Sequence, residues 1–123
     1  MVVVVSDFLV DAGWQRELQA LATRHDVVAV EVLDRRELAL PDVGYVTLVD
    51  AETGKRRVVD TTDAAVRLRF AQRARARRDS IARDIAGAGS DHLRVQTGVD
   101  WVAAVARFAQ RRRMRRTAAA RRP

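Results

Sequence analysis

The sequence predicts an α/β fold, a partial doubly wound parallel sheet of about three strands with three helices and an inserted β-hairpin. Two observations carry this prediction. Short, mostly apolar segments occur at 1–5 and 27–33, and such segments are typical of strands buried on both faces of a parallel sheet, to which we add a third strand at 92–97. Between and after them lie longer segments with apolar residues at helical spacing, which favours an alternating arrangement of strands and helices.

The first strand, helix and second strand form a β-α-β unit. Met1 to Val5 is continuously apolar and ends at Ser6-Asp7. From Trp14 to Arg24 the apolar residues recur at helical spacing and predict one buried stripe. The strand Val27 to Leu33 follows, and the spacing suits a right-handed crossover.

A hairpin and a long helix come next. Pro41 and Gly44 mark a loop after the second strand, and short strands are predicted at 45–49 and 56–60, joined by a turn that contains Gly54. Thr62 or Asp63 can accept hydrogen bonds from the first backbone N–H groups of a helix that runs to about Ala86. Its apolar side comprises Val66, Phe70, Ala74, Ile81 and Ile85, and Gly87 and Gly89 end it.

The last predicted elements are the strand His92 to Thr97 and a helix capped by Asp100. The helix is expected to bury Trp101, Val105 and Phe108, and Trp14 and Phe70 are expected to be mostly buried as well. After Arg111 the pattern weakens. We therefore predict one domain over residues 1–112, with the hairpin as an excursion at about 45–60, and a basic, disordered tail over residues 113–123.

The charge of the chain is concentrated at its end. The net charge is +7, but residues 107–123 carry eight arginines and no acid, whereas residues 1–106 carry 15 basic and 16 acidic side chains. A nucleic-acid function would therefore depend on the tail, whose arginines could neutralise phosphates non-specifically. The chain has no cysteine, which excludes disulfides and thiolate chemistry and agrees with a cytoplasmic location. It also lacks an apolar stretch of roughly 20 residues, the length that a membrane span needs.

The first strand has the composition of a sheet interior but opens the chain. One interpretation is a simple edge strand. The other is that the chain begins in the middle of a domain whose missing strands belong on that open edge. In either case an open edge beside Val3 and Val5 favours self-association.

Several separated segments resemble the C-terminal region of the DUF58 family, in the order of that family. They read VVVVSDFL, LATRHDVVAVEVLDRRELALPDVGYVTLVDAETGKRRVVDT, DHLRVQT and DWVAAVARF, and span Val2 to about Arg112. The resemblance implies the C-terminal half of a von Willebrand factor type A-like domain, apparently truncated at its N-terminus. Such bacterial domains carry a metal-ion-dependent adhesion site built from an Asp-x-Ser-x-Ser loop, a threonine and a later aspartate.

The resemblance assigns Asp7 as the third-motif metal ligand, with Ser6 supporting it from outside the coordination sphere. The first two motifs have no counterpart in this sequence, so the site is incomplete. Magnesium is implied in a complete domain, and no cofactor is expected to bind this chain tightly, because one carboxylate does not hold Mg²⁺. For this chain by itself, Asp7 is better explained as a loop residue that caps the following turn, whereas in a completed domain the role of metal ligand is preferred.

The other titratable residues give weak signals. Asp34 follows the second strand and could lie at the rim of a ligand site, although aspartates there usually form turns; Asp11 is another acid in a loop after a strand. Asp26 precedes its strand, as do His25 and His92, and these are expected at the opposite edge of the sheet. We identify no catalytic residues, because no nucleophile lies in a recognisable motif with a base.

Two functions follow from these observations. The first is a non-enzymatic protein-interaction module, an adaptor whose resemblance to its family implies a MoxR-type AAA+ ATPase as partner. The alternative is a small basic protein that binds nucleic acid non-specifically through its arginine-rich tail.

Overall fold

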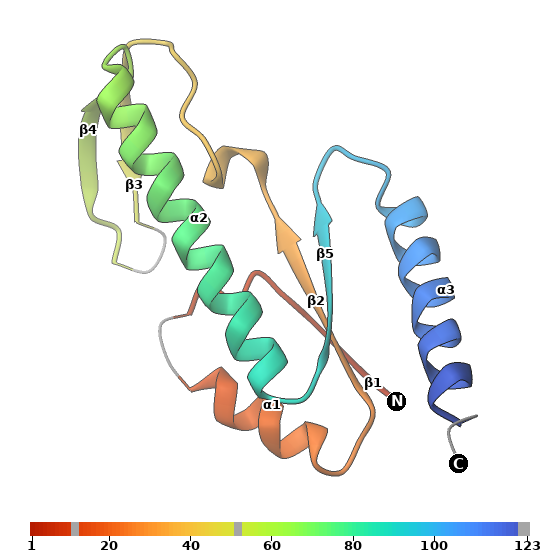
Figure 1. Ribbon diagram of the computed structural model, residues 1–123. Coiled ribbons are helices and arrows are strands. Elements are labelled where there is room, and N and C mark those ends of the chain that lie inside the picture. Colours follow the sequence, from red (N-terminus) through yellow and green to blue (C-terminus); the bar gives the residue numbers. More distant parts are fainter. Residues whose placement is uncertain (11–12, 51–52, 121–123) are drawn as a thin grey trace. The chain divides into compact units, whose positions relative to one another are not determined.

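The computed structural model describes residues 1–10, 13–50 and 53–120, and these form two compact units. One comprises Met1–Leu33 with Ile81–Pro123, and the other comprises Asp34–Ser80 (Figure 1). The predicted α/β class is confirmed. The hairpin, predicted as an excursion at about 45–60, belongs to one compact unit with the loop before it and with much of the following helix.

The first unit is built on a three-stranded parallel sheet. Its strands are β1 (Val2–Ser6), β2 (Val27–Leu33) and β5 (Asp91–Gln96), in the order β1-β2-β5. Val3 is in register with Val28, and Val30 with Leu93. Helix α1 (Trp14–Ala22) connects the first two strands, as the apolar spacing predicts.

The core lies on the face of the sheet that carries α1 and the C-terminal end of helix α2 (Ala64–Gly87). Ala29 and Ile85 are fully buried there. The buried cluster comprises Phe8, Leu18, Val27, Ala29, Ile81, Ile85 and Ala88. Since side chains alternate across a strand, Val2 and Val4 pack against this cluster while Val3 and Val5 face the other side.

Helix α2 ends in a Schellman motif, as its glycines predict. Gly89 has a φ of 77°, a conformation that glycine adopts without steric cost. The N–H of Ser90 donates to the carbonyl of Ile85 at 3.3 Å, and that of Gly89 to Ala86 at 3.0 Å. This turn directs the chain straight into β5.

Helix α3 (Trp101–Ala120) contacts β5 on the opposite face of the sheet (Figure 1). Asp100 caps it as expected, since Oδ1 accepts from the N–H of Ala103 at 3.0 Å. The expected burial of Trp101 is wrong: this residue is 59% exposed. Phe108 and Trp14 are only half-buried. The reason for the exposed tryptophan is that, among the described residues, α3 is the helix that lines this face, and it leaves much of the face uncovered.

The prediction of a disordered tail from residue 113 is also wrong for the described part. The helix continues to Ala120, and residues 121–123 lie outside the described residues. Asp11, the acid predicted in the loop after the first strand, also lies outside them. Arginine is a good helix former. Arg112 is buried and forms ion pairs with Asp26, just before β2, and with Asp91, the first residue of β5, so the basic segment is held in place.

The second unit contains a β-hairpin, a short 3-10 helix and the N-terminal part of α2. Strands β3 (Tyr45–Val49) and β4 (Arg56–Asp60) pair antiparallel, and η1 (Arg35–Glu37) follows the second strand of the sheet. The hydroxyl of Thr61, fully buried, donates to the carbonyl of Gly44 at 2.7 Å. Asp63 rather than Thr62 caps α2, because its Oδ1 accepts from the N–H of Ala65 at 2.8 Å. Phe70 on α2 is half-buried, less than expected.

Candidate functional site

The turn after β1 holds the two residues that the sequence singled out. The hydroxyl of Ser6 accepts from the N–H of Phe8 at 3.0 Å, and Oδ1 of Asp7 accepts from the N–H of Leu9 at 3.1 Å. Phe8 has a φ of 56° and packs against Trp14 with ring centroids 4.9 Å apart. Both polar side chains therefore shape a tight turn that returns Phe8 to the core.

The described side chains near Asp7 do not by themselves make a metal site. Over the described parts of the chain, no three His, Cys, Asp or Glu side chains are grouped so that they could hold a metal ion. Asp34 uses Oδ1 to accept from the N–H of Arg36 at 2.9 Å and caps η1. Mg²⁺ needs several oxygen ligands in near-octahedral geometry, so these residues do not fit a resident ion without ligands from elsewhere.

Sequence reasoning missed a buried carboxylate, that of Glu31 in the middle of β2. Glu31 is fully buried and its Oε2 accepts hydrogen bonds from Nε2 of His92 and Nε of Arg94, both at 2.8 Å. Burial raises the pKa of this carboxyl, but the hydrogen bonds from His92 and Arg94 outweigh it and hold the pKa below its usual value. A lone glutamate in an otherwise apolar strand was the signal that could have revealed this cluster.

A second charged cluster fixes the end of α3 to the N-terminal ends of β2 and β5. Nε of Arg112 donates to Oδ2 of Asp91 at 2.6 Å, and Nη2 of Arg112 donates to Oδ1 of Asp26. Arg115 bonds Asp91 at 3.1 Å, and Arg116 bonds Asp26. Burial would raise the pKa of Asp26, but the hydrogen bond from Arg116 and the charges of both arginines lower it.

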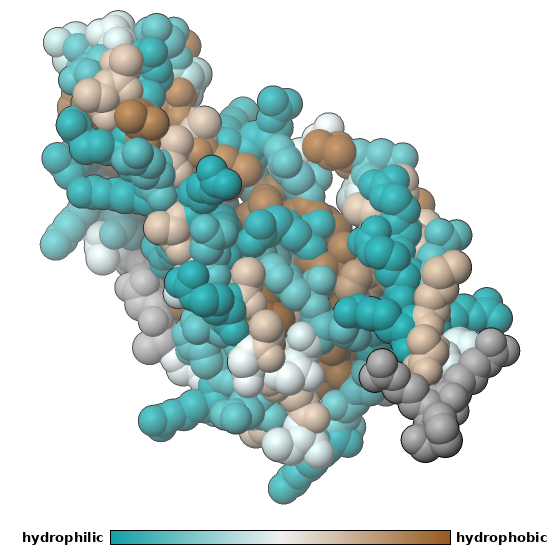
Figure 2. Space-filling view, viewed as in Figure 1, coloured by the Kyte–Doolittle hydropathy of each residue, from teal (hydrophilic) through white to brown (hydrophobic). Residues whose placement is uncertain are grey.

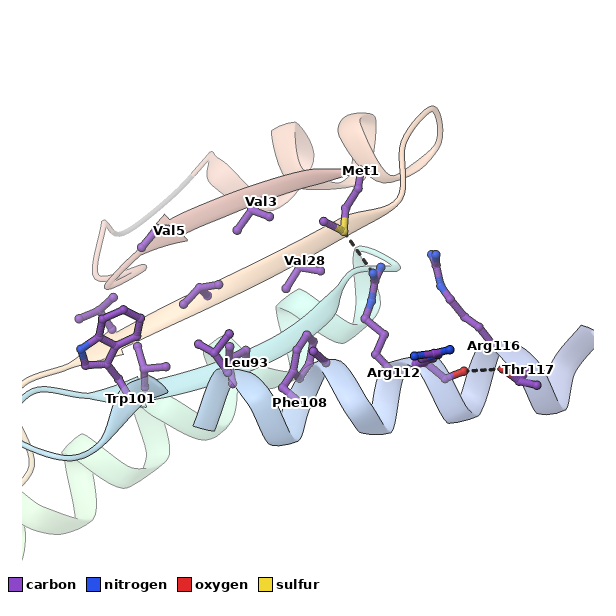
Figure 3. A pocket seen from close by; sticks show the side chains of 16 residues that line it. Met1, Val3, Val5, Val28, Leu93, Trp101, Phe108, Arg112, Arg116 and Thr117 are labelled. Atoms are coloured by element: carbon purple, nitrogen blue, oxygen red, sulfur yellow. Dashed lines mark hydrogen bonds between the residues drawn. The ribbon is translucent and has the colours of Figure 1, made fainter. Parts of the chain in front are cut away.

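An apolar groove of about 750 Å³ runs along the uncovered face of the sheet, beside α3. In Figure 3 the side chains of Val3, Val5 and Val28 face it from the strands, while Trp101 and Phe108 face it from α3. Hydrophobic side chains are visible beside α3 in Figure 2 as well. The other apolar residues that line it are Met1, Val30, Val32, Leu93, Val95, Val105 and Ala109.

The groove is exposed along much of its length, and one end is basic. Val3 is 51% exposed and Val5 63%, which is unusual for valines of a sheet with helices on both faces. Arg112 and Arg116 line the basic end but are paired with aspartates. Arg113 also lines this end, and within the described residues its side chain has no polar partner. The site can therefore accept an apolar surface with an acid at one end.

None of the helices in the described parts of the chain is both long and apolar enough to cross a membrane.

Comparisons with known proteins find similar mycobacterial proteins. It is 49% identical over 113 residues to an uncharacterized protein of Mycobacterium avium, covering 92% of this chain and 66% of that protein. Uncharacterized proteins of Mycobacterium bovis and Mycobacterium tuberculosis are 48% identical over the same length, and the chain spans 35% of each. No solved structure matches. The family described as "Protein of unknown function DUF58" matches residues 1–80. The chain therefore belongs to the DUF58 family.

Proposed function

We propose that this chain is a non-enzymatic, cytoplasmic protein-interaction module of the von Willebrand A-like type, an adaptor whose partner is a MoxR-type AAA+ ATPase. The observation that supports the proposal best is the uncovered apolar face of the sheet. Soluble proteins rarely expose large contiguous apolar patches unless these bind something. The identity of the partner rests on the resemblance to the DUF58 family. The family match supports membership of this family and names no partner.

The shape of the groove favours an amphipathic helix of the partner. One wall is the helix α3 and the floor is the face of a parallel sheet, so a second helix beside α3 would bury Val3 and Val5. Burial of apolar surface contributes about 25 cal/mol per Å², so covering this face would favour binding. An acidic residue near one end of that helix would pair with Arg113.

The experiment is a binding measurement between this chain and the purified MoxR-type ATPase by biolayer interferometry. Val3→Asp and Val5→Asp place a charge in the groove and are expected to weaken binding at least about tenfold, because a charge is costly to bury without a partner. Val43→Asp is the matched control, since Val43 is 65% exposed and lies in the other unit. Equal loss in the control, or no binding of the unmodified chain, would reject the adaptor proposal.

The metal role of Asp7 is part of the same proposal. We assign it only to an assembly in which a second polypeptide supplies the remaining oxygen ligands. Asp7→Ala should then remove a dependence of ATPase binding on Mg²⁺. Binding that stays the same with Mg²⁺, with EDTA and in the Asp7→Ala variant would leave Asp7 with its role in the turn alone.

Nucleic-acid binding through a free basic tail is less well supported. Arg112, Arg115 and Arg116 belong to the segment that would carry it, and all three pair with Asp26 or Asp91. The remaining arginines of α3 are spread along a helix that the sheet holds in place. We therefore do not advance this function.

A further inference from the structure

The Asp34–Ser80 unit contains a groove of its own, of about 380 Å³, between the β-hairpin and α2. Its lining divides into two chemical types. The apolar part is formed mainly by Leu40, Leu48, Val59, Val66 and Phe70. The charged part is formed by Arg57 on β4, by Arg69 and Arg73 on α2, and by Asp60.

The three arginines of this groove have no polar partner among the described residues, in contrast to others of the same unit. Arg67 pairs with Asp42 at 3.4 Å, and Arg78 pairs with Glu37 at 2.6 Å. Neither an ion pair nor a hydrogen bond is found for the side chains of Arg57, Arg69 and Arg73 within residues 34–50 and 53–80. Their charge is therefore available to a ligand.

The arrangement brings like charges together. Arg69 and Arg73 are four residues apart on α2, so they lie on one side of the helix as neighbours. Arg57 is in register with Leu48 across the hairpin, and both line the groove. Like charges at this spacing destabilise the folded chain slightly, and an anion that bound among them would relieve the repulsion.

The one acid of the groove does not neutralise the arginines. Oδ1 of Asp60 accepts from both the N–H of Thr62, at 2.9 Å, and its hydroxyl, at 2.7 Å. These two hydrogen bonds lower the pKa of Asp60, so the carboxylate stays ionised but is directed at the start of α2. The groove keeps an excess of positive charge beside an apolar floor.

We propose that this groove binds an acidic peptide segment of a protein partner, with carboxylates on the three arginines and an apolar side chain on the floor between Phe70 and Val59. Arginine guanidinium groups pair with carboxylates through directed, charge-assisted hydrogen bonds. The proposal is independent of the groove on the three-stranded sheet, because the two grooves share no residue and lie in different units.

A peptide fits this groove better than a nucleic acid does. The carboxylate of Asp60 would repel a continuous phosphate backbone, whereas a peptide can present an apolar or polar side chain at that position. Phe70 is the one aromatic residue of the lining, so a platform for stacked bases is lacking. The apolar floor has no role in binding phosphates but suits a leucine or valine between acids.

The test uses the full chain and a fluorescein-labelled octapeptide in which glutamate and leucine alternate. Fluorescence anisotropy should show binding that weakens as salt rises from 50 to 300 mM, whereas a peptide with glutamine in place of glutamate should bind at least about tenfold more weakly. The groove variant is the triple Arg57→Gln, Arg69→Gln, Arg73→Gln. It should lose at least about tenfold in affinity, because charge-assisted hydrogen bonds are among the strongest in proteins.

A matched control removes the same charge from the same elements. Arg56→Gln, Arg75→Gln and Arg83→Gln change one exposed arginine of β4 and two of α2 that do not line the groove. This triple variant should keep its affinity within about twofold, and both variants should show the circular dichroism spectrum of the parent chain. Equal losses in the two triples, or equal binding of the glutamine peptide, would overturn the proposal. So would tighter binding of a single-stranded DNA octamer, which would show that the groove prefers a phosphate backbone.

Discussion

Nε of Arg112, in the second half of α3, donates a hydrogen bond of 2.6 Å to Oδ2 of Asp91, the first residue of β5. The Arg112 side chain is 11% exposed, and its Nη1 also reaches Sδ of Met1 at 3.3 Å. One side chain thus ties the basic end of the chain to the start of two strands. The basic second half of α3 is consequently tied to the sheet.

Replacement of Arg112 is expected to loosen the end of α3. Arg112→Ala removes the donor that Asp26 and Asp91 share, so the backbone amides of residues 110–119 should exchange with solvent faster while those of β2 stay protected. Hydrogen-exchange mass spectrometry measures this. Arg111→Ala is the control, because Arg111 is exposed and has no polar partner among the described residues. Equal acceleration in both variants would show that the ion pairs do not hold the helix.

Loss of the charge on Glu31 is expected to destabilise the three-stranded sheet. Glu31→Gln weakens the hydrogen bonds from His92 and Arg94. It should lower the free energy of unfolding by about 1.5–3 kcal/mol, the range for a hydrogen bond to a charged group. The loss is no larger because Arg94 is 40% exposed and can turn to solvent. Urea denaturation at pH 7 gives this value. An unchanged midpoint would mean that the cluster adds nothing to stability.

The contribution of Glu31 is also expected to depend on pH. Its folded-state pKa lies below the usual value of 4.5, so the stabilisation is fully present above pH 4.5 and is lost as the pH falls through the folded-state pKa. The difference in unfolding free energy between the parent chain and Glu31→Gln should therefore shrink below pH 4.5. Urea titrations of both proteins at a series of pH values from 7 to 3 measure it. A constant difference over this range would contradict the lowered pKa.

Truncation to alanine should destabilise the chain far less at Trp101 than at Ile85. The sequence predicted a buried Trp101, whose replacement by alanine would cost about 3–5 kcal/mol. Because Trp101 is 59% exposed, Trp101→Ala should instead cost less than about 1 kcal/mol. Ile85 is fully buried in the core cluster, and Ile85→Ala should cost about 2–5 kcal/mol. Thermal denaturation distinguishes them, and similar costs for both would place Trp101 in the core.

Self-association through β1 is the remaining expectation. Within the described residues β1 pairs only with β2, and an unpaired strand edge beside exposed valines is a template for a second strand. The chain should sediment as oligomers at micromolar concentrations, and Val3→Lys should shift it toward the monomer. Thr47→Lys on β3 serves as the control, since it adds the same charge to an exposed position of a strand in the other unit. A monomeric parent chain would rule out this edge as an interface.

The sequence determined the elements of this protein because their signals are local. The strands at 27–33, 45–49 and 56–60 lie where alternation, β-branched residues and turn glycines predict them, and the caps at Asp63 and Asp100 follow from backbone donors that need acceptors nearby. Family membership could likewise be read from contiguous segments, and residues 1–80 match the DUF58 family.

Which faces are covered and which charges meet depends on how the elements are arranged in space. The spacing of Trp101, Val105 and Phe108 predicts an apolar side of a helix, but whether another element covers it depends on where that helix lies on the sheet. Glu31 and His92 are 61 residues apart, and Arg112 and Asp26 are 86 apart, so neither pairing leaves a trace in local sequence. Burial and ion pairing are properties of distances in space, which periodicity along the chain does not encode.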